Sequence, residues 1–302
     1  MKTRSLDLTA KRHVPVEAGM WLPEQTRSQK LWELRRRLLR LDYAFSFTVV
    51  AILLICLIGA PWITTYDPYA VDLKAATHPP SLEHWMGTDD YGRDIFTRVV
   101  YGSRYSLGMG LIVTMVATLI GVILGGTAGF LGGRVDELIM RFTDMVMGFP
   151  AILFAMIIAA ILGSNLTNAI IAAAAVWWPS YVRLLRGQVL SVKNDLYVEA
   201  VRSIGATNVR ILMRHILPNS WAPIIVRSTM DLGRAVIFTG TLSFIGLGAQ
   251  PPIPEWGTML AEARWFILDA WWYITFPGLA IFVTVFAFSI LGDIIDEILR
   301  PT

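Results

Sequence analysis

Long apolar runs separated by charged segments form the main pattern of this sequence. Six runs each hold about 20 mostly apolar residues, the length that crosses a bilayer as a helix. They cover approximately residues 43–62, 105–126, 145–162, 166–182, 221–247 and 270–292. The pattern therefore predicts an all-α, polytopic membrane protein with about six transmembrane helices.

The composition agrees with a membrane solvent. The 302 residues are 55% hydrophobic and only 16% charged, which is too apolar for an ordinary soluble domain. The formal net charge is +3, and the basic residues lie in segments that flank the apolar runs. Lipid headgroups and insertion topology account for basic residues in such places, so we discard nucleic acid as a partner.

The distribution of Lys and Arg predicts the orientation. Nineteen of the 26 basic residues lie in the segments on one side of the predicted spans, both chain ends included, and five lie on the opposite side. The remaining two, Arg227 and Arg234, fall inside the fifth run. Because cytoplasmic segments carry the excess of basic residues, we predict cytoplasmic termini in an inner (plasma) membrane.

The segments outside the runs divide the chain further. Residues 1–42 are polar and basic and predict a cytoplasmic tail, whereas residues 43–302 predict a single transmembrane domain. Within the tail, residues 29–41 place leucines on one helical face and arginines around the rest, which indicates an amphipathic helix on the membrane surface. Residues 63–104 and 248–269 are rich in turn formers and predict extracytoplasmic segments.

Four glycines follow one another at a spacing of four residues in the second run. They are Gly121, Gly125, Gly129 and Gly133. This spacing puts them on one stripe of a helix, where a second helix can approach closely. The stripe predicts helix packing, either against another span of this chain or against another subunit.

The cytoplasmic segment of residues 184–218 is unusually structured for a connection between two spans. Asp195 is placed to cap a short helix that Gly205 ends, and Thr207 is placed to cap a second helix that ends at Pro218. We therefore predict a helix-turn-helix knob over residues 195–218. Its apolar positions either form a surface for a partner or pack on the protein's own helices.

Three charged residues share one face of the fifth run. Arg227, Asp231 and Arg234 are spaced by four and three residues, so they can neutralise one another along a helix. Isolated charges within a membrane are costly. This face either lines a solute pathway or forms an ion ladder near the cytoplasmic surface that fixes the helix orientation.

Residues that carry chemistry are sparse. The four histidines are far apart and Cys56 is the single cysteine, so we expect no metal site. No G-x-x-x-x-G-K-[ST] sequence is present to hold a nucleotide phosphate, and no nucleophile with a base lies in the runs. We expect a chain that binds no cofactor itself and is not an enzyme.

An ion-driven secondary transporter is the alternative class. Such carriers favour internal repeats and paired broken spans with carboxylates at mid-membrane. Asp231 is the only acidic residue deep in a run, and no clear repeat is visible. Co-purification of an ATPase distinguishes the two classes, since a secondary carrier works alone.

The predicted knob resembles the EAA loop of ABC importer permeases. The matching residues are Glu199, Ala200, Val201, Gly205, Leu217 and Pro218, with the glycine six positions after the glutamate. His215, which stands just before Ile216-Leu217-Pro218, is similar to the variant found in permeases of the dipeptide, oligopeptide, nickel and glutathione group. Val201 departs from the usual second alanine.

Two further stretches resemble the same group, and the likeness extends over roughly residues 35–300. One is residues 84–94, ahead of the second run, and the other is residues 242–252 with 255–257, after the fifth. Thr239 stands where many relatives carry an acidic residue, which puts a pathway role at that position in doubt.

The resemblance implies the architecture of a type I ABC importer permease. Such a subunit forms half of a pathway for small peptides or similar solutes, together with a homologous second permease subunit. It also implies an extracytoplasmic solute-binding protein and one or two ATP-binding subunits, which hold ATP and magnesium. In that family Glu199, Ala200 and Gly205 would form the turn that docks on the ATP-binding subunit.

Overall fold

The computed structural model of the protein describes residues 41–299. Contacts divide the chain into two units, Met1–Arg40 and Leu41–Thr302, and all the described residues belong to the second. All but the last two residues of the predicted tail, with nearly all of its surface helix at 29–41, therefore lie outside the described residues. The predicted division of the chain at residues 42 and 43 stays a prediction.

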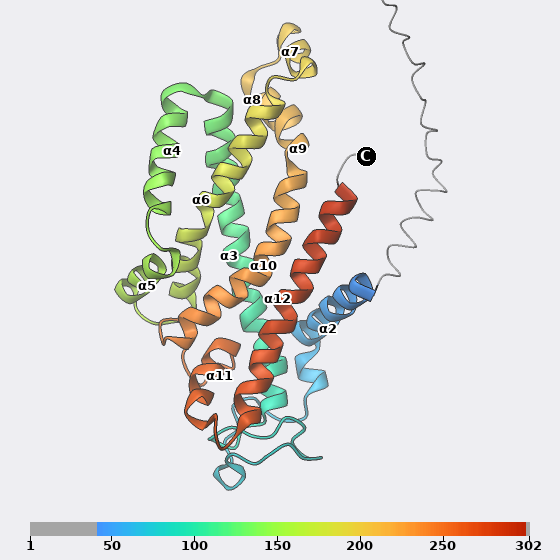
Figure 1. Cartoon of the computed structure of the whole chain (residues 1–302), viewed down its shortest axis with the longest axis vertical. Helices are drawn as coiled ribbons and strands as arrows, with labels where there is room; N and C mark the ends of the chain where they lie inside the picture. The colour runs from blue at the N-terminus through green and yellow to red at the C-terminus, as the bar shows by residue number, and fades with distance from the viewer. Residues whose placement is uncertain (1–40, 300–302) are drawn as a thin grey trace, which may run out of the picture. The chain divides into compact units, whose positions relative to one another are not determined.

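The described part of the chain is helical. Its long helices are α2 (Leu41–Ile63), α3 (Ile95–Leu131), α6 (Leu166–Val192), α10 (Trp221–Phe244) and α12 (Trp271–Leu299) (Figure 1). The shorter helices are α4 (Gly133–Met147), α5 (Ala151–Leu162), α7 (Leu196–Ser203), α8 (Asn208–Ile211), α9 (Leu217–Asn219) and α11 (Trp256–Ala263). Single turns at Leu73–Ala75, Leu212–Ile216 and Arg264–Phe266 complete the set.

Helix α3 holds the unit together, because it contacts α2, α4, α6, α10, α11 and α12. The most extensive of these contacts is with α6, while α10 packs chiefly on α12 and α3. Among the described residues, α2, α3 and α12 are long and apolar enough to cross a membrane. The full count of six spans stays a prediction.

The span predicted over residues 145–162 is not one continuous helix. The structure has two helices there, α4 and α5, which meet at a bend of 88°. Gly148, Phe149 and Pro150 separate them, and Pro150 can neither donate a backbone hydrogen bond nor leave its predecessor free to be helical. Helix α5 alone has 12 residues, about 18 Å of helix, which is too short to cross a bilayer.

Two other helices are longer than predicted. Helix α3 begins at Ile95 because the Asp94 side chain accepts a hydrogen bond from the Thr97 backbone N–H and caps it. Helix α6 continues beyond residue 182 to Val192. These extensions carry both helices beyond the apolar runs, and the extension of α6 leads directly into the predicted knob.

Three of the four predicted stripe glycines pack α3 against α6. A Cβ atom on Gly121 would overlap Tyr181, one on Gly125 would lie 2.6 Å from the Val182 carbonyl oxygen, and one on Gly129 would lie 2.9 Å from the Val189 Cβ. The stripe therefore serves contact within the chain. Gly133 is not part of it, because α3 ends at Leu131 and Gly133 begins α4 at a φ of 56°.

We predict that Gly121→Ala destabilises the protein whereas Gly108→Ala does not. A Cβ at Gly121 overlaps Tyr181, and overpacking of this kind costs about 1–3 kcal/mol. Gly108 lies in the same helix with nothing within 4 Å of its Cβ position, so alanine there should gain roughly 0.5–1 kcal/mol of helix stability. Thermal unfolding of the purified variants measures the difference. Equal midpoints for the two variants would contradict the assigned α3–α6 contact.

Candidate functional site

The knob has the predicted turn at Gly205 and the predicted cap at Thr207, whereas the predicted side-chain cap by Asp195 is absent. Asp195 precedes α7 and its backbone oxygen accepts a hydrogen bond from Val198 at 2.9 Å, although its side chain makes no capping bond. Gly205 follows α7 at a φ of 84°, in the left-handed region that glycine occupies without strain. The Thr207 hydroxyl accepts a hydrogen bond from the Arg210 N–H at 3.4 Å and caps α8.

The predicted end of the second helix at Pro218 is wrong. The chain passes from α8 through a π turn, Leu212–Ile216, into α9, where Pro218 lies in the first turn. Proline is tolerated there because a first-turn N–H has no partner within the helix. The break comes at Ser220, whose φ of −97° and ψ of 0° separate α9 from α10.

One face of the knob is buried against α3 and α6. Val198, Ile211 and Ile216 have no exposed surface, and they cluster with Leu185 and Val189 of α6 and with Phe130 of α3. Lys193 adds hydrogen bonds from its ammonium group to the carbonyl oxygens of Gly129 and Phe130, at 3.3 and 3.0 Å. The knob is therefore fixed to the same α3–α6 pair that the glycine stripe brings together.

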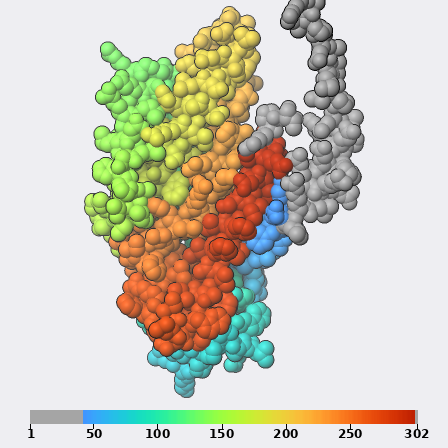
Figure 2. Space-filling model, in the orientation of Figure 1, coloured from blue at the N-terminus to red at the C-terminus, as the bar shows by residue number. Residues whose placement is uncertain are grey.

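Other apolar side chains of the knob are uncovered by the described chain. They are Leu196 (82% exposed), Ile204 (84%), Val209 (73%) and Met213 (61%), and exposed charged residues such as Glu199, Arg202 and Arg210 alternate with them along the sequence. The knob lies at one end of the described unit (yellow to gold in Figure 2). The sequence allowed either a surface for a partner or packing on the protein's own helices. The structure has apolar residues of both kinds, some packed on α3 and α6 and some exposed.

The residues of the predicted coupling loop divide between these two faces. Glu199, Ala200, Gly205 and Pro218 are exposed, Val201 and His215 are half-buried, and Leu217 is buried. Tyr197, which the sequence reading did not single out, donates a hydrogen bond to the His215 carbonyl oxygen at 3.2 Å and ties α7 to the π turn. No residue spacing signals this contact, since it joins positions 18 apart.

Arg227, Asp231 and Arg234 meet in α10 as their spacing predicts. The Arg227 Nε lies 2.7 Å from one Asp231 carboxylate oxygen, and an Arg234 terminal nitrogen lies 3.3 Å from the other. Asp231 is fully buried, whereas the side chains of Arg227 and Arg234 are 41% and 54% exposed. Thr239, one turn beyond Arg234, is buried and donates its hydroxyl to the Ala235 carbonyl oxygen at 2.9 Å.

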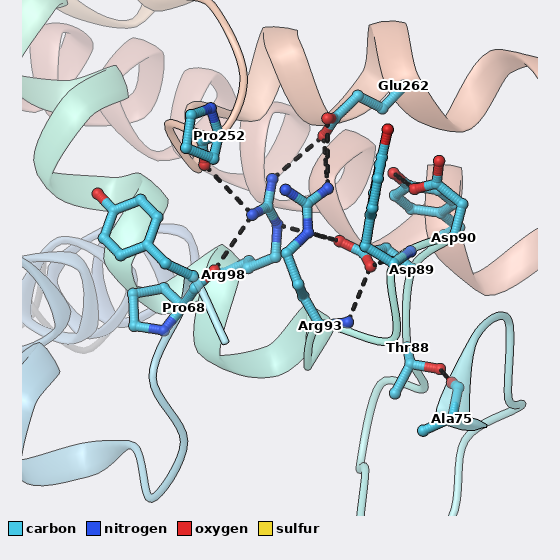
Figure 3. Close-up of polar contacts among 12 residues, drawn as sticks. Pro68, Ala75, Thr88, Asp89, Asp90, Arg93, Arg98, Pro252 and Glu262 are labelled. Carbon is cyan, nitrogen blue, oxygen red and sulfur yellow. Dashed lines mark hydrogen bonds and ion pairs between the residues drawn. The ribbon is translucent and has the colours of Figure 1, made fainter. Parts of the chain in front are cut away.

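A second charged cluster joins the two predicted extracytoplasmic segments (Figure 3). Asp89 contacts Arg93 at 2.5 Å and Arg98 at 3.4 Å, and Glu262 of α11 contacts them at 3.3 and 3.1 Å. Arg98 also donates to the carbonyl oxygens of Pro68 and Pro252. Two carboxylates balance two guanidinium groups. The cluster was not predictable from the sequence because Glu262 is 169 positions from Arg93.

The electrostatics of this cluster follow from its burial. Burial raises the pKa of Glu262 above its usual range, although Arg98 and Arg93 pull that pKa back down. Burial lowers the pKa of Arg93, but the carboxylates of Asp89 and Glu262 outweigh this and raise it overall. Each of the four buried charges is therefore stabilised by the opposite charges beside it. Together they hold α11 to the chain that leads into α3.

A cleft of about 740 Å³ lies beside this cluster. Tyr91 and Arg93 line it from one segment, and Gln250, Glu262 and Trp265 line it from the other. Within residues 41–299, no three His, Cys, Asp or Glu side chains are grouped closely enough to hold a metal ion.

Solved structures share this fold. Two inward-facing crystal forms of the MetNI methionine ABC transporter each contain a chain that superposes with TM-scores of 0.51 and 0.52, at 18% and 19% sequence identity. The matches cover 65% and 67% of this chain and 95% and 97% of the other. At this identity the likeness concerns the fold alone.

Sequence relatives are much more similar. The probable D,D-dipeptide transport system permease protein DdpC of Escherichia coli K12 is 46% identical over 85% of this chain and 86% of its own. The dipeptide transport system permease protein DppC of Alkalihalophilus pseudofirmus is 44% identical over 85% of this chain and 82% of its own. The glutathione transport system permease protein GsiD of Escherichia coli O6:K15:H31 is 45% identical over 92% of both chains.

The family match covers the helices from α3 onward together with the knob. Residues 99–302 match the family described as binding-protein-dependent transport system inner membrane component. This region contains the glycine stripe, the knob and the charged face of α10. The chain therefore belongs to the family of binding-protein-dependent transport system inner membrane components, as a multi-pass permease subunit and not the ATP-hydrolysing one.

Proposed function

We propose that this chain is one of two homologous permease subunits in an ATP-driven importer of small peptides or similar solutes. The names of its relatives support this substrate class, because they are a dipeptide, a probable D,D-dipeptide and a glutathione transport system permease protein. In this proposal about six spans of type I architecture cross the inner membrane and both termini are cytoplasmic. An extracytoplasmic binding protein delivers the solute to the segments of residues 63–104 and 248–269.

The exposed apolar face of the knob is the observation that supports the proposal most strongly. Leu196, Ile204, Val209 and Met213 stay uncovered although the opposite face is tightly buried. Several large apolar side chains exposed on a small, firmly packed element are typical of a protein interaction site. The knob also lies in the segment that the basic residues predict to be cytoplasmic. The occupant that fits is an ATP-binding subunit.

Motion of the knob can reach the membrane through its buried face. Val198 and Ile211 pack on Leu185 and Val189 of α6, and α6 packs on the glycine stripe of α3. A displacement of the knob therefore moves α3 and α6 together, because close-packed side chains transmit strain. In this proposal ATP and magnesium bind the partner subunits, since this sequence has no phosphate-binding loop of its own.

The open face of α10 is the proposed lining of the solute pathway. Arg227 and Arg234 are exposed in the chain, and charged side chains in membrane segments face water-filled paths or protein and not lipid. An ion ladder near the cytoplasmic surface fits less well, because Arg234 lies 13 residues into a helix of 24.

We predict that Gly205→Val uncouples ATP hydrolysis from transport. Valine at a φ of 84° costs at least about 1–2 kcal/mol, so the turn between α7 and α8 should change shape. Gly187→Val is the matched control, because Gly187 lies in α6 with nothing within 4 Å of its Cβ position and needs no left-handed conformation. Transport per ATP hydrolysed, measured in proteoliposomes with the partner subunits, should fall only for Gly205→Val. Full coupling in that variant would contradict the proposed role of the turn.

We predict that Leu196→Glu and Ile204→Glu prevent the ATP-binding subunit from co-purifying with the permease. A charge placed in a desolvated apolar contact should cost about 2 kcal/mol or more of binding free energy per residue. Leu268→Glu is the control, because Leu268 is 94% exposed but lies in the segment proposed to be extracytoplasmic. Pull-down of tagged permease with its ATP-binding subunits measures the result. Undiminished co-purification of the two knob variants would refute this docking surface.

A further inference from the structure

The exposed face of α10 carries an unbalanced charge. Asp231 is the carboxylate that both Arg227 and Arg234 contact, so the three side chains together carry one net positive charge. In the described part of the chain neither arginine has an ion pair with any other acid. The extracytoplasmic cluster, by contrast, has two carboxylates for two guanidinium groups.

The position of Arg234 is unsuitable for a charged side chain that contacts lipid alone. Arg234 lies near the midpoint of α10, and its side chain is 54% exposed. Helix α10 packs on α3, α6, α11 and α12. Arg234 lies on an uncovered side of this part of the helix with Ile237, which is also exposed. In the proposed six-span architecture α10 crosses the membrane, where a guanidinium group needs an anion or water, since hydrocarbon supplies neither.

The arrangement leaves hydrogen-bond donors available. Each guanidinium group has five N–H donors, and the hydrogen bond that each makes here is to Asp231. The two arginines are seven residues apart, about 10.5 Å along the helix, and lie on the same face. Asp231, itself fully buried, holds both side chains in place. The remaining donors are thus oriented before any ligand arrives.

We propose that Arg234, with Arg227, forms a transient binding site for the carboxylate group of the transported solute. This inference rests on the proposed import of small peptides, each of which ends in a carboxylate. Guanidinium groups recognise carboxylates through two parallel hydrogen bonds, which an ammonium group cannot supply. Because Asp231 neutralises part of the charge, the site binds a carboxylate weakly enough to release it, as a transport pathway requires.

Thermal stability of the purified complex with and without a probe tests the site. The complex contains this chain, the second permease subunit and the ATP-binding subunits, and the probes are alanyl-alanine and alanyl-alaninamide, which lacks the carboxylate. Binding raises the midpoint of unfolding. We expect alanyl-alanine to raise it in the wild type and the amide not to. We expect Arg234→Gln to abolish the shift and Arg234→Lys to retain only part of it.

Ile225→Gln is the matched control. Ile225 is exposed on α10 but nine residues from Arg234, on the opposite side of the helix, so the shift with alanyl-alanine should persist. Equal shifts with both probes, or a full shift in Arg234→Gln, would overturn the site. Loss of the second permease subunit from Arg234→Gln would also overturn it, because the arginine would then be neutralised by an acid of that subunit.

Uptake separates a failure of this site from a failure of the proposed function. Proteoliposomes with ATP and the binding protein should accumulate alanyl-alanine, and Arg234→Gln should lower the rate at least about ten-fold, the value of one charge-assisted hydrogen bond. Equal uptake by wild type and Arg234→Gln overturns the site alone. No uptake by the wild type overturns the proposed peptide import and the site together.

Discussion

The close contact between α3 and α6 is the constraint on which the rest of the structure depends. Gly121, Gly125 and Gly129 remove the side chains that would otherwise separate the two helices. The C-terminal half of α6 is therefore held along α3, and its last turns support the buried face of the knob. The knob is held rigidly because the α3–α6 pair on which it packs is itself closely packed. A flexible connection at this place would absorb motion instead of passing it to the spans.

Two charged clusters in this chain differ in burial and in charge balance, and the difference indicates which one has a structural role and which one a functional role. Asp89, Arg93, Arg98 and Glu262 are balanced and largely buried, and they join segments that are distant in the sequence. Such a network specifies how α11 lies against the start of α3. The two arginines that contact the buried Asp231 are 41% and 54% exposed, and the three side chains carry an excess of one positive charge. An unbalanced charge facing open space needs a ligand or a partner, which is why it supports a functional proposal.

Local features of this protein could be predicted from its sequence, while features that depend on distant partners could not. The turn at Gly205 and the Thr207 cap follow from short-range conformational preferences. The charged cluster around Glu262 was not predictable, because no pattern relates an acid in one loop to arginines in another. The bend after Met147 was obscured by a continuous apolar run, in which Pro150 was the only strong sign of a break. Gly133 was wrongly assigned to the stripe because its spacing fits a helix that in fact ends at Leu131.

The central claim is that the open face of the knob is cytoplasmic and is covered by an ATP-binding subunit. Labelling of a cysteine at position 204 tests it most directly. Ile204→Cys is made together with Cys56→Ser, so that the new thiol is the only one in the chain. It should react with a membrane-impermeant maleimide in inside-out vesicles, and the ATP-binding subunits should protect it. Reaction from the outside, or no protection by those subunits, would contradict the account.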